Sequence, residues 1–219
     1  MTDLYSVFGN PIAHSKSPDI HTAFAEQAKQ DMVYTAMLVP IDGFTHAAED
    51  FFRKGLGTNI TVPFKQDAFD FADVLTDRAQ RAGAVNTLAL KDGQVVGDTT
   101  DGVGLVRDLI KNQQCELKEK KILVLGAGGA VRGVLEPLLE EGPSSILIAN
   151  RTASKAVQLA EDFRDFGNIN GCGFDEVPAD YFDLIINGTS ASLSGELPPV
   201  PVEIINNKTI CYDMMYSAE

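Results

Sequence analysis

One stretch in the second half of the chain combines a buried strand, a glycine turn and the start of a helix. The apolar run Ile122–Leu125 has no alternation, which is typical of a strand covered on both faces of a parallel sheet. A helical pattern of apolar residues opens at Val131, directly after the glycines. Backbone N–H groups and the helix dipole at such a turn attract an anion, so the stretch favours dinucleotide binding over a structural turn. The residues of this turn that are predicted to bind the cofactor are Gly126, Ala127, Gly128, Gly129 and Ala130.

Strand and helix patterns alternate on both sides of this stretch, which predicts an α/β protein of two domains. Residues 1–101 are expected to form an α/β substrate-binding catalytic domain with a mixed sheet, because a hairpin is predicted around the turn at 91–94. Residues 102–219 are expected to form a Rossmann-like, doubly wound domain that is incomplete at its C-terminal end.

Composition and charge exclude several classes of protein. The net charge of −13 opposes binding to nucleic acid, and no run reaches the roughly 18 apolar residues of a membrane span. The N-terminus lacks the pattern of a secretory signal, and the three cysteines are widely spaced, so we expect a cytoplasmic protein without disulfides. No histidine, aspartate and glutamate spacing predicts a metal site, and the expected partner is a small-molecule substrate.

The end of the second predicted strand of the Rossmann-like domain favours NADP over NAD. NAD-binding sheets place a carboxylate there for the ribose 2′-hydroxyl. This chain has Asn150, Arg151 and Thr152 at that point, with Lys155 one turn later. A guanidinium binds a 2′-phosphate through paired hydrogen bonds, whereas a carboxylate repels it. A solvated Arg151 at a helix start would oppose the helix dipole, which argues against the simpler explanation.

Three polar clusters lie at strand ends or loops of the first half. They are Ser15 with Ser17, then Asn59, Thr61 and Lys65, and finally Asn86 with Asp101. Asn59 and Thr61 are two apart on a predicted strand and share a face. Each cluster alone has a structural explanation, such as a helix cap or a surface lysine.

Taken together, the motifs closely resemble those of the shikimate dehydrogenase family. The motifs run in the family order from Val7 to Tyr216 and are Gly9–Pro18, Asn59–Lys65, Gly83–Thr87, Gly97–Gly102, Gly126–Ala130, Asn150–Thr152 and Tyr212–Tyr216. The resemblance implies an oxidoreductase that uses NADP(H) to reduce 3-dehydroshikimate reversibly to shikimate in aromatic amino-acid biosynthesis.

The resemblance also implies roles for individual residues. Lys65 and Asp101 would form the catalytic pair, and the substrate side would include Ser15, Ser17, Asn59, Thr61, Asn86 and Tyr216. The two serines would bind the substrate carboxylate, whereas Thr61, Asn86 and Asp101 would hold ring hydroxyls. On the cofactor side, Thr189 and Met214 would lie near the nicotinamide.

Family members continue past the position of Glu219 through helices that carry a substrate-contacting glutamine, so the resemblance implies a chain that lacks them. Family membership and turnover are therefore separate expectations. Two alternatives stay open: a fragment that binds NADP or substrate without turnover, and an NAD-dependent quinate/shikimate dehydrogenase. A homodimer is possible.

Overall fold

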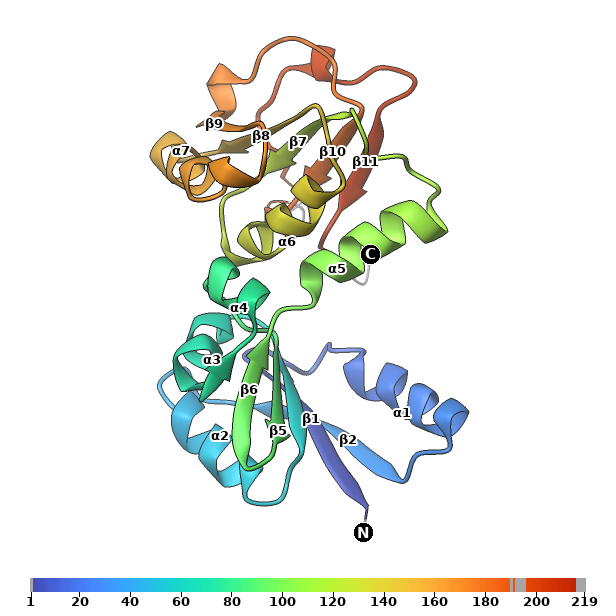
Figure 1. Cartoon of the computed structure of the whole chain (residues 1–219), viewed down its shortest axis with the longest axis vertical. Coiled ribbons are helices and arrows are strands. Elements are labelled where there is room, and N and C mark those ends of the chain that lie inside the picture. Colours follow the sequence, from blue (N-terminus) through green and yellow to red (C-terminus); the bar gives the residue numbers. More distant parts are fainter. Residues whose placement is uncertain (1, 190, 192–195, 216–219) are drawn as a thin grey trace. The chain divides into compact units, whose positions relative to one another are not determined.

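The computed structural model describes residues 2–189, 191 and 196–215, which form two compact units that divide between Thr100 and Asp101. Each unit is built around its own sheet (Figure 1). This agrees with the two-domain α/β fold that the sequence predicts.

The first unit contains a six-stranded mixed sheet in the order β2-β1-β3-β5-β6-β4. Strand β1 is parallel to β2 and β3, whereas β5 is antiparallel to β3 and β6 in the predicted hairpin. The elements of this unit are β1 (Asp3–Gly9), α1 (Ser17–Ala28), β2 (Met32–Leu38), α2 (Phe44–Phe52), β3 (Gly57–Ile60), α3 (Lys65–Phe71), β4 (Val74–Leu75), α4 (Asp77–Ala82), β5 (Thr87–Lys91) and β6 (Gln94–Asp98).

Alternate residues of β1 face the two sides of this sheet. Phe8 is fully buried in the larger core, where its ring meets the edge of Phe44 of α2 at 6.1 Å between centroids. Val7 faces the other side and packs with Ile12 and Tyr34 in a smaller cluster. Helices α1 and α2 accordingly lie on opposite faces of the sheet (Figure 1).

The second unit contains a five-stranded, all-parallel sheet in the order β11-β10-β7-β8-β9, as a doubly wound fold requires. Its main elements are α5 (Asp101–Arg107), a π-helical turn η1 (Asp108–Asn112), β7 (Lys121–Leu125), α6 (Gly129–Glu140), β8 (Ser145–Asn150), α7 (Ala153–Asp162), β9 (Ile169–Gly173), β10 (Leu184–Asn187) and β11 (Ile210–Asp213). Short 3-10 helices within the described ranges include η2 (Arg164–Phe166), η3 (Phe174–Glu176) and η5 (Val202–Ile204).

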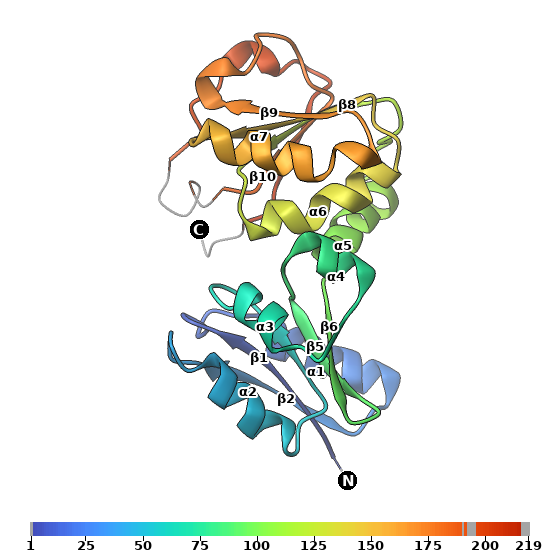
Figure 2. The same ribbon diagram turned by 60° about the vertical axis from the view of Figure 1, so that its left-hand side comes forward.

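Strand β7 is buried on both faces, as its unbroken apolar run predicts. Ile122 and Val124 lie in a core shared with α5, α6 and α7, whereas Leu123 and Leu125 lie in the core of the opposite face. Figure 2 shows α6 and α7 side by side against one face of the sheet. The C-terminal end of β7 is therefore held rigidly from both sides, and the glycine turn starts there.

Helices α5 and α6 pack closely because Gly102 has no side chain. A Cβ at this position would lie 2.4 Å from the backbone oxygen of Gly133 and 2.8 Å from Cγ of Pro137. Such distances are too short for a carbon atom, so only glycine fits here.

At three places the structure differs from what the local sequence indicates. Ser17 before Pro18 is typical of a helix N-cap, but α1 has Lys16 at its N-cap, without a side-chain cap, and Ser17 is its first residue. The apolar pattern predicts a helix over 103–112, whereas α5 begins earlier, at Asp101, and continues into a π-helical turn. Strand β4 has only two residues and forms by pairing with β6, so no local pattern predicted it.

Candidate functional site

The glycine turn after β7 supplies no side-chain cap to the first backbone N–H groups of α6. Gly126 has φ +107°, a backbone conformation that glycine adopts readily, and its N–H donates to the oxygen of Ala149 at 2.8 Å. Gly128 is the N-cap of α6 and supplies no side-chain hydrogen bond. A Cβ at Gly128 or Gly129 would meet no protein atom within 4 Å, so packing of the chain does not require glycine there. The missing side chains instead leave open space over the helix N-terminus, which fits a phosphate group.

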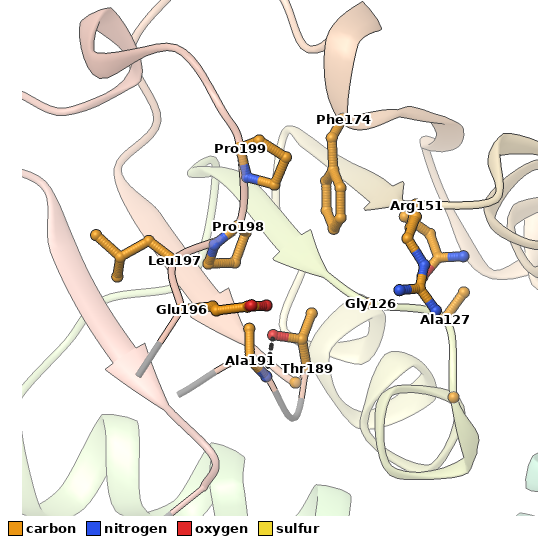
Figure 3. Close-up of a pocket in the computed structure, with 13 residues that line it drawn as sticks. Gly126, Ala127, Arg151, Phe174, Thr189, Ala191, Glu196, Leu197, Pro198 and Pro199 are labelled. Atoms are coloured by element: carbon orange, nitrogen blue, oxygen red, sulfur yellow. Dashed lines mark hydrogen bonds between the residues drawn. The ribbon is translucent and has the colours of Figure 1, made fainter. Parts of the chain in front are cut away.

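A pocket of about 510 Å³ opens beside this turn (Figure 3). It is lined by residues that follow several strands of the parallel sheet, the edge at which ligands of open α/β sheets bind. The lining residues are Gly126, Ala127, Gly128, Asn150, Arg151, Phe174, Gly188, Thr189, Ala191, Glu196, Leu197, Pro198 and Pro199.

The end of β8 places Arg151 at this pocket. The side-chain amide of Asn150 donates to the backbone oxygen of Thr152 at 3.0 Å, which fixes the turn between β8 and α7. Arg151 stands between them, exposed, and its side chain lies near Ala127 in Figure 3. Asn150 and Arg151 therefore line the pocket, whereas the predicted residues Thr152 and Lys155, like Gly129 and Ala130, are not among its lining residues.

Phe174 is a pocket residue that the sequence analysis missed. Gly173 pairs in register with Asn150, so Phe174 and Arg151 each follow the last paired residue of neighbouring strands. Figure 3 shows the Phe174 ring directed into the pocket between Pro199 and Arg151. Because β9 ends at Gly173, immediately before Phe174, the rule that ligands bind at strand ends could have identified this residue. The segment Glu196–Pro199 has no comparable signal.

The end of β10 positions Thr189 and Met214. The Asn187 side chain accepts from the Thr189 hydroxyl at 2.7 Å and donates to Asp213 at 3.0 Å. The N–H of Met214 donates to the oxygen of Asn187 at 2.9 Å. Thr189 lines the pocket and Met214 lies beside the adjoining strand end, whereas Tyr216 lies outside the described residues.

The loop between β1 and α1, which contains Ser15, is attached to the end of the first unit's sheet. The backbone N–H of Asn10 donates to Val62 at 3.0 Å, and its side chain donates to the oxygen of Val39 at 2.9 Å. Farther along the loop, the Ser15 hydroxyl accepts from the N–H of Ser17 at 3.3 Å. Both serines are half-buried.

Backbone hydrogen bonds bring Thr61, Lys65 and Asn86 to this same end of the sheet. The N–H of Thr61 donates to Phe8 at 2.9 Å, at the end of β1. The oxygen of Lys65 accepts from Val85 at 2.9 Å, and the oxygen of Asn86 accepts from Ile60 at 2.7 Å. The structure thus joins two clusters that lie more than twenty positions apart in the sequence.

Asp98, in the motif Gly97–Gly102, has a carboxylate that accepts hydrogen bonds from Arg78 and Thr76 and so stabilises the fold. Burial alone would raise the pKa of this carboxyl, but hydrogen bonds from Arg78 and Thr76 outweigh burial and hold the pKa below its ordinary value. Asp101, by contrast, is the first residue of α5, where a carboxylate interacts favourably with the helix dipole.

The described residues contain no group of histidine, cysteine and acidic side chains that could hold a metal ion. Within the same part of the chain, no helix is long and apolar enough to cross a membrane.

Both halves of the chain match known family models. Residues 7–88 match the shikimate dehydrogenase substrate binding domain, and residues 108–194 match the shikimate / quinate 5-dehydrogenase model. The chain is 58% identical to the shikimate dehydrogenase (NADP(+)) of Cellvibrio japonicus, over 100% of the chain and 80% of that relative.

Solved structures agree with this match. An Ael1 enzyme from Pseudomonas putida is 40% identical with a TM-score of 0.93, over 99% of this chain and 80% of that one. Shikimate 5-dehydrogenase from Thermus thermophilus, in complex with NADP(H) and shikimate, is 31% identical with a TM-score of 0.84, over 97% of this chain and 78% of that one.

The two sheets and the glycine turn define a two-domain, Rossmann-like α/β protein, and its relatives place it among the oxidoreductases. Within that class, the chain belongs to the shikimate dehydrogenase family.

Proposed function

We propose that this chain catalyses the reversible, NADP-dependent reduction of 3-dehydroshikimate to shikimate, a step of aromatic amino-acid biosynthesis. The observation that supports this most is the 58% identity over the whole chain to a shikimate dehydrogenase (NADP(+)). Residues 1–101 are the substrate-binding catalytic domain in this proposal, and residues 102–219 bind NADP. The cytoplasm is the proposed location, supported by three cysteines that are all unpaired. A homodimer is a further expectation, and light scattering of the purified chain tests it.

The pocket of the second unit suits NADP. The open space at Gly128 and Gly129 fits the pyrophosphate, and Arg151 offers a guanidinium for the 2′-phosphate. No acidic residue occupies the first turn of α7, the helix that follows Arg151. In the proposed assignment Asn150, Thr152 and Lys155 complete the 2′-phosphate side, whereas Thr189 and Met214 serve the nicotinamide side.

The first unit supplies the substrate side in this proposal. The hydroxyls of Ser15 and Ser17 donate to the substrate carboxylate, and Thr61 and Asn86 hold ring hydroxyls. Reduction of a ketone develops negative charge on its oxygen, which must then accept a proton. When bound, NADPH supplies the hydride. Lys65 holds the required proton at Nζ, and Asp101 is its acid–base partner.

The test is the change in nicotinamide absorbance when the chain is mixed with shikimate and NADP. We expect turnover by the wild-type chain and none by Lys65→Ala, which should still bind NADP. The matched control is Lys91→Ala, because Lys91 is exposed at the end of β5. Unchanged turnover in Lys65→Ala would exclude its assigned role. Binding of NADP by the wild-type chain without turnover would instead support a non-catalytic fragment.

A further inference from the structure

A continuous chain of side-chain hydrogen bonds connects Tyr34 of β2 to Asn86. The Tyr34 hydroxyl donates to Oδ1 of Asn59 at 2.6 Å, and Nδ2 of Asn59 donates to the Thr87 hydroxyl at 3.2 Å. The Thr87 hydroxyl then donates to Oδ1 of Asn86 at 2.9 Å. This series of hydrogen bonds runs from β2 to β5 and links residues that are far apart in the sequence.

The direction of these bonds is fixed at two points. The backbone N–H of Thr100, which can only donate, donates to Oδ1 of Asn86 at 3.1 Å, and the Tyr34 hydroxyl donates to Oδ1 of Asn59. A phenol that donates to an amide makes the oxygen of that amide the acceptor, so the Asn59 amide must direct its NH₂ group to Thr87. The Thr87 oxygen then accepts, and its single hydrogen is available for Asn86. Asn86 consequently directs its oxygen toward Thr87, while its NH₂ group donates to Oγ1 of Thr100 at 3.1 Å.

Burial makes this direction persistent. Tyr34 is 9% exposed and Asn86 8% exposed, so water competes little for their polar atoms. The Tyr34 ring is stacked on the His21 imidazole, with 4.2 Å between centroids and an interplanar angle of 2°. Burial also raises the pKa of Tyr34, which keeps its hydroxyl protonated and able to donate.

We propose that Tyr34 is a positioning residue for substrate recognition. By orienting Asn59 and Thr87 it acts together with the Thr100 backbone N–H to hold the Asn86 amide in one orientation. This inference rests on the proposed function, in which Asn86 holds a ring hydroxyl of the substrate. Asn59 has its oxygen committed to Tyr34 and one N–H committed to Thr87, so it acts as the link between them. An amide turned the other way would present an acceptor in place of a donor to the substrate, or the reverse.

The test compares Tyr34→Phe with the wild-type chain in steady-state kinetics. Tyr34→Phe keeps the ring and removes the hydroxyl, and we expect the KM for shikimate to rise about 5- to 10-fold, the size of one lost hydrogen bond. The KM for NADP should not change. Tyr5 pairs with Tyr34 in register, so Tyr5→Phe is the matched control and should have wild-type constants.

Thr87 tests whether the effect passes along the chain. Thr87→Val removes the hydroxyl and should raise the KM for shikimate as Tyr34→Phe does, whereas Thr87→Ser should retain the wild-type value. The double variant Tyr34→Phe with Thr87→Val should have a KM for shikimate no higher than that of either single variant, because both substitutions interrupt the same series of hydrogen bonds. Fully additive effects would overturn the proposal.

The side-chain amide resonances of Asn59 and Asn86 give a readout that does not depend on the reaction. In the ligand-free chain, Tyr34→Phe should shift both pairs of signals and Tyr5→Phe neither. If the Asn86 signals of Tyr34→Phe do not shift, the positioning role of Tyr34 is overturned, whatever the turnover of that variant. Shifted signals in a chain whose wild type neither binds nor turns over shikimate would refute the proposed function and, with it, the substrate-recognition role of Tyr34.

Discussion

Replacing Arg151 by alanine removes the guanidinium at the end of β8 that lines the pocket. In the proposed complex this group distinguishes NADP from NAD, because the two cofactors differ only in the 2′-phosphate. A hydrogen bond to a charged partner contributes about 1.5–3 kcal/mol, which corresponds to roughly a 10- to 150-fold change in affinity. Arg151 is exposed, so solvent screening places the expected loss of NADP affinity at the lower end, about 10-fold.

The assay is calorimetric titration of the wild-type chain and Arg151→Ala with NADP and, separately, with NAD. NADP affinity should fall about 10-fold while NAD affinity changes less than about twofold, which would correspond to under 0.5 kcal/mol. Arg164→Ala is the matched control, because Arg164 is an exposed arginine of the same unit that pairs with Glu161 and is not among the residues that line the pocket. Equal losses for the two cofactors would refute recognition of the 2′-phosphate by Arg151.

Three further predictions concern the pocket and the stability of each unit. The chain has no tryptophan, so Phe174→Trp creates a single reporter whose fluorescence NADP should quench; Phe166→Trp, outside the residues that line the pocket, should not respond. Gly102→Ala should lower the free energy of unfolding by about 1–3 kcal/mol, because the added Cβ overlaps with the backbone of α6. Gly104→Ala, on the same helix, places its Cβ in open space and should raise the free energy of unfolding by about 0.5–1 kcal/mol. The reverse order in chemical denaturation would contradict the packing argument. Because the pKa of Asp98 is lowered, its stabilising contribution is present above the unfolded-state pKa of about 3.9 and is lost as the pH falls through the folded-state pKa. Asp98→Asn should therefore be most destabilising near neutral pH. A loss of stability that does not depend on pH would exclude this account.

Local sequence patterns determined the elements that depend on local physics. Strand β7 was predictable because four consecutive apolar residues suit a strand that is buried on both faces. The turn that follows was predictable because glycines between a strand and a helix form a recognisable anion site. Gly126, Gly128, Asn150, Arg151 and Thr189, all predicted cofactor residues, line the pocket.

Only the tertiary structure decided which distant residues meet. Phe174 and Arg151 share a pocket because Gly173 pairs with Asn150, and sheet register depends on packing across the whole unit. The two-residue strand β4 exists only through its pairing with β6.

The polar chain from Tyr34 to Asn86 shows the same division most clearly. The sequence identified Asn59 and Asn86 as candidate substrate residues, but it could not show that β2, β3 and β5 bring Tyr34 and Thr87 against them. Residue types determine what each side chain is able to donate or accept. The fold alone determines which partner receives that bond, because the distances that allow it are set by how the strands pair.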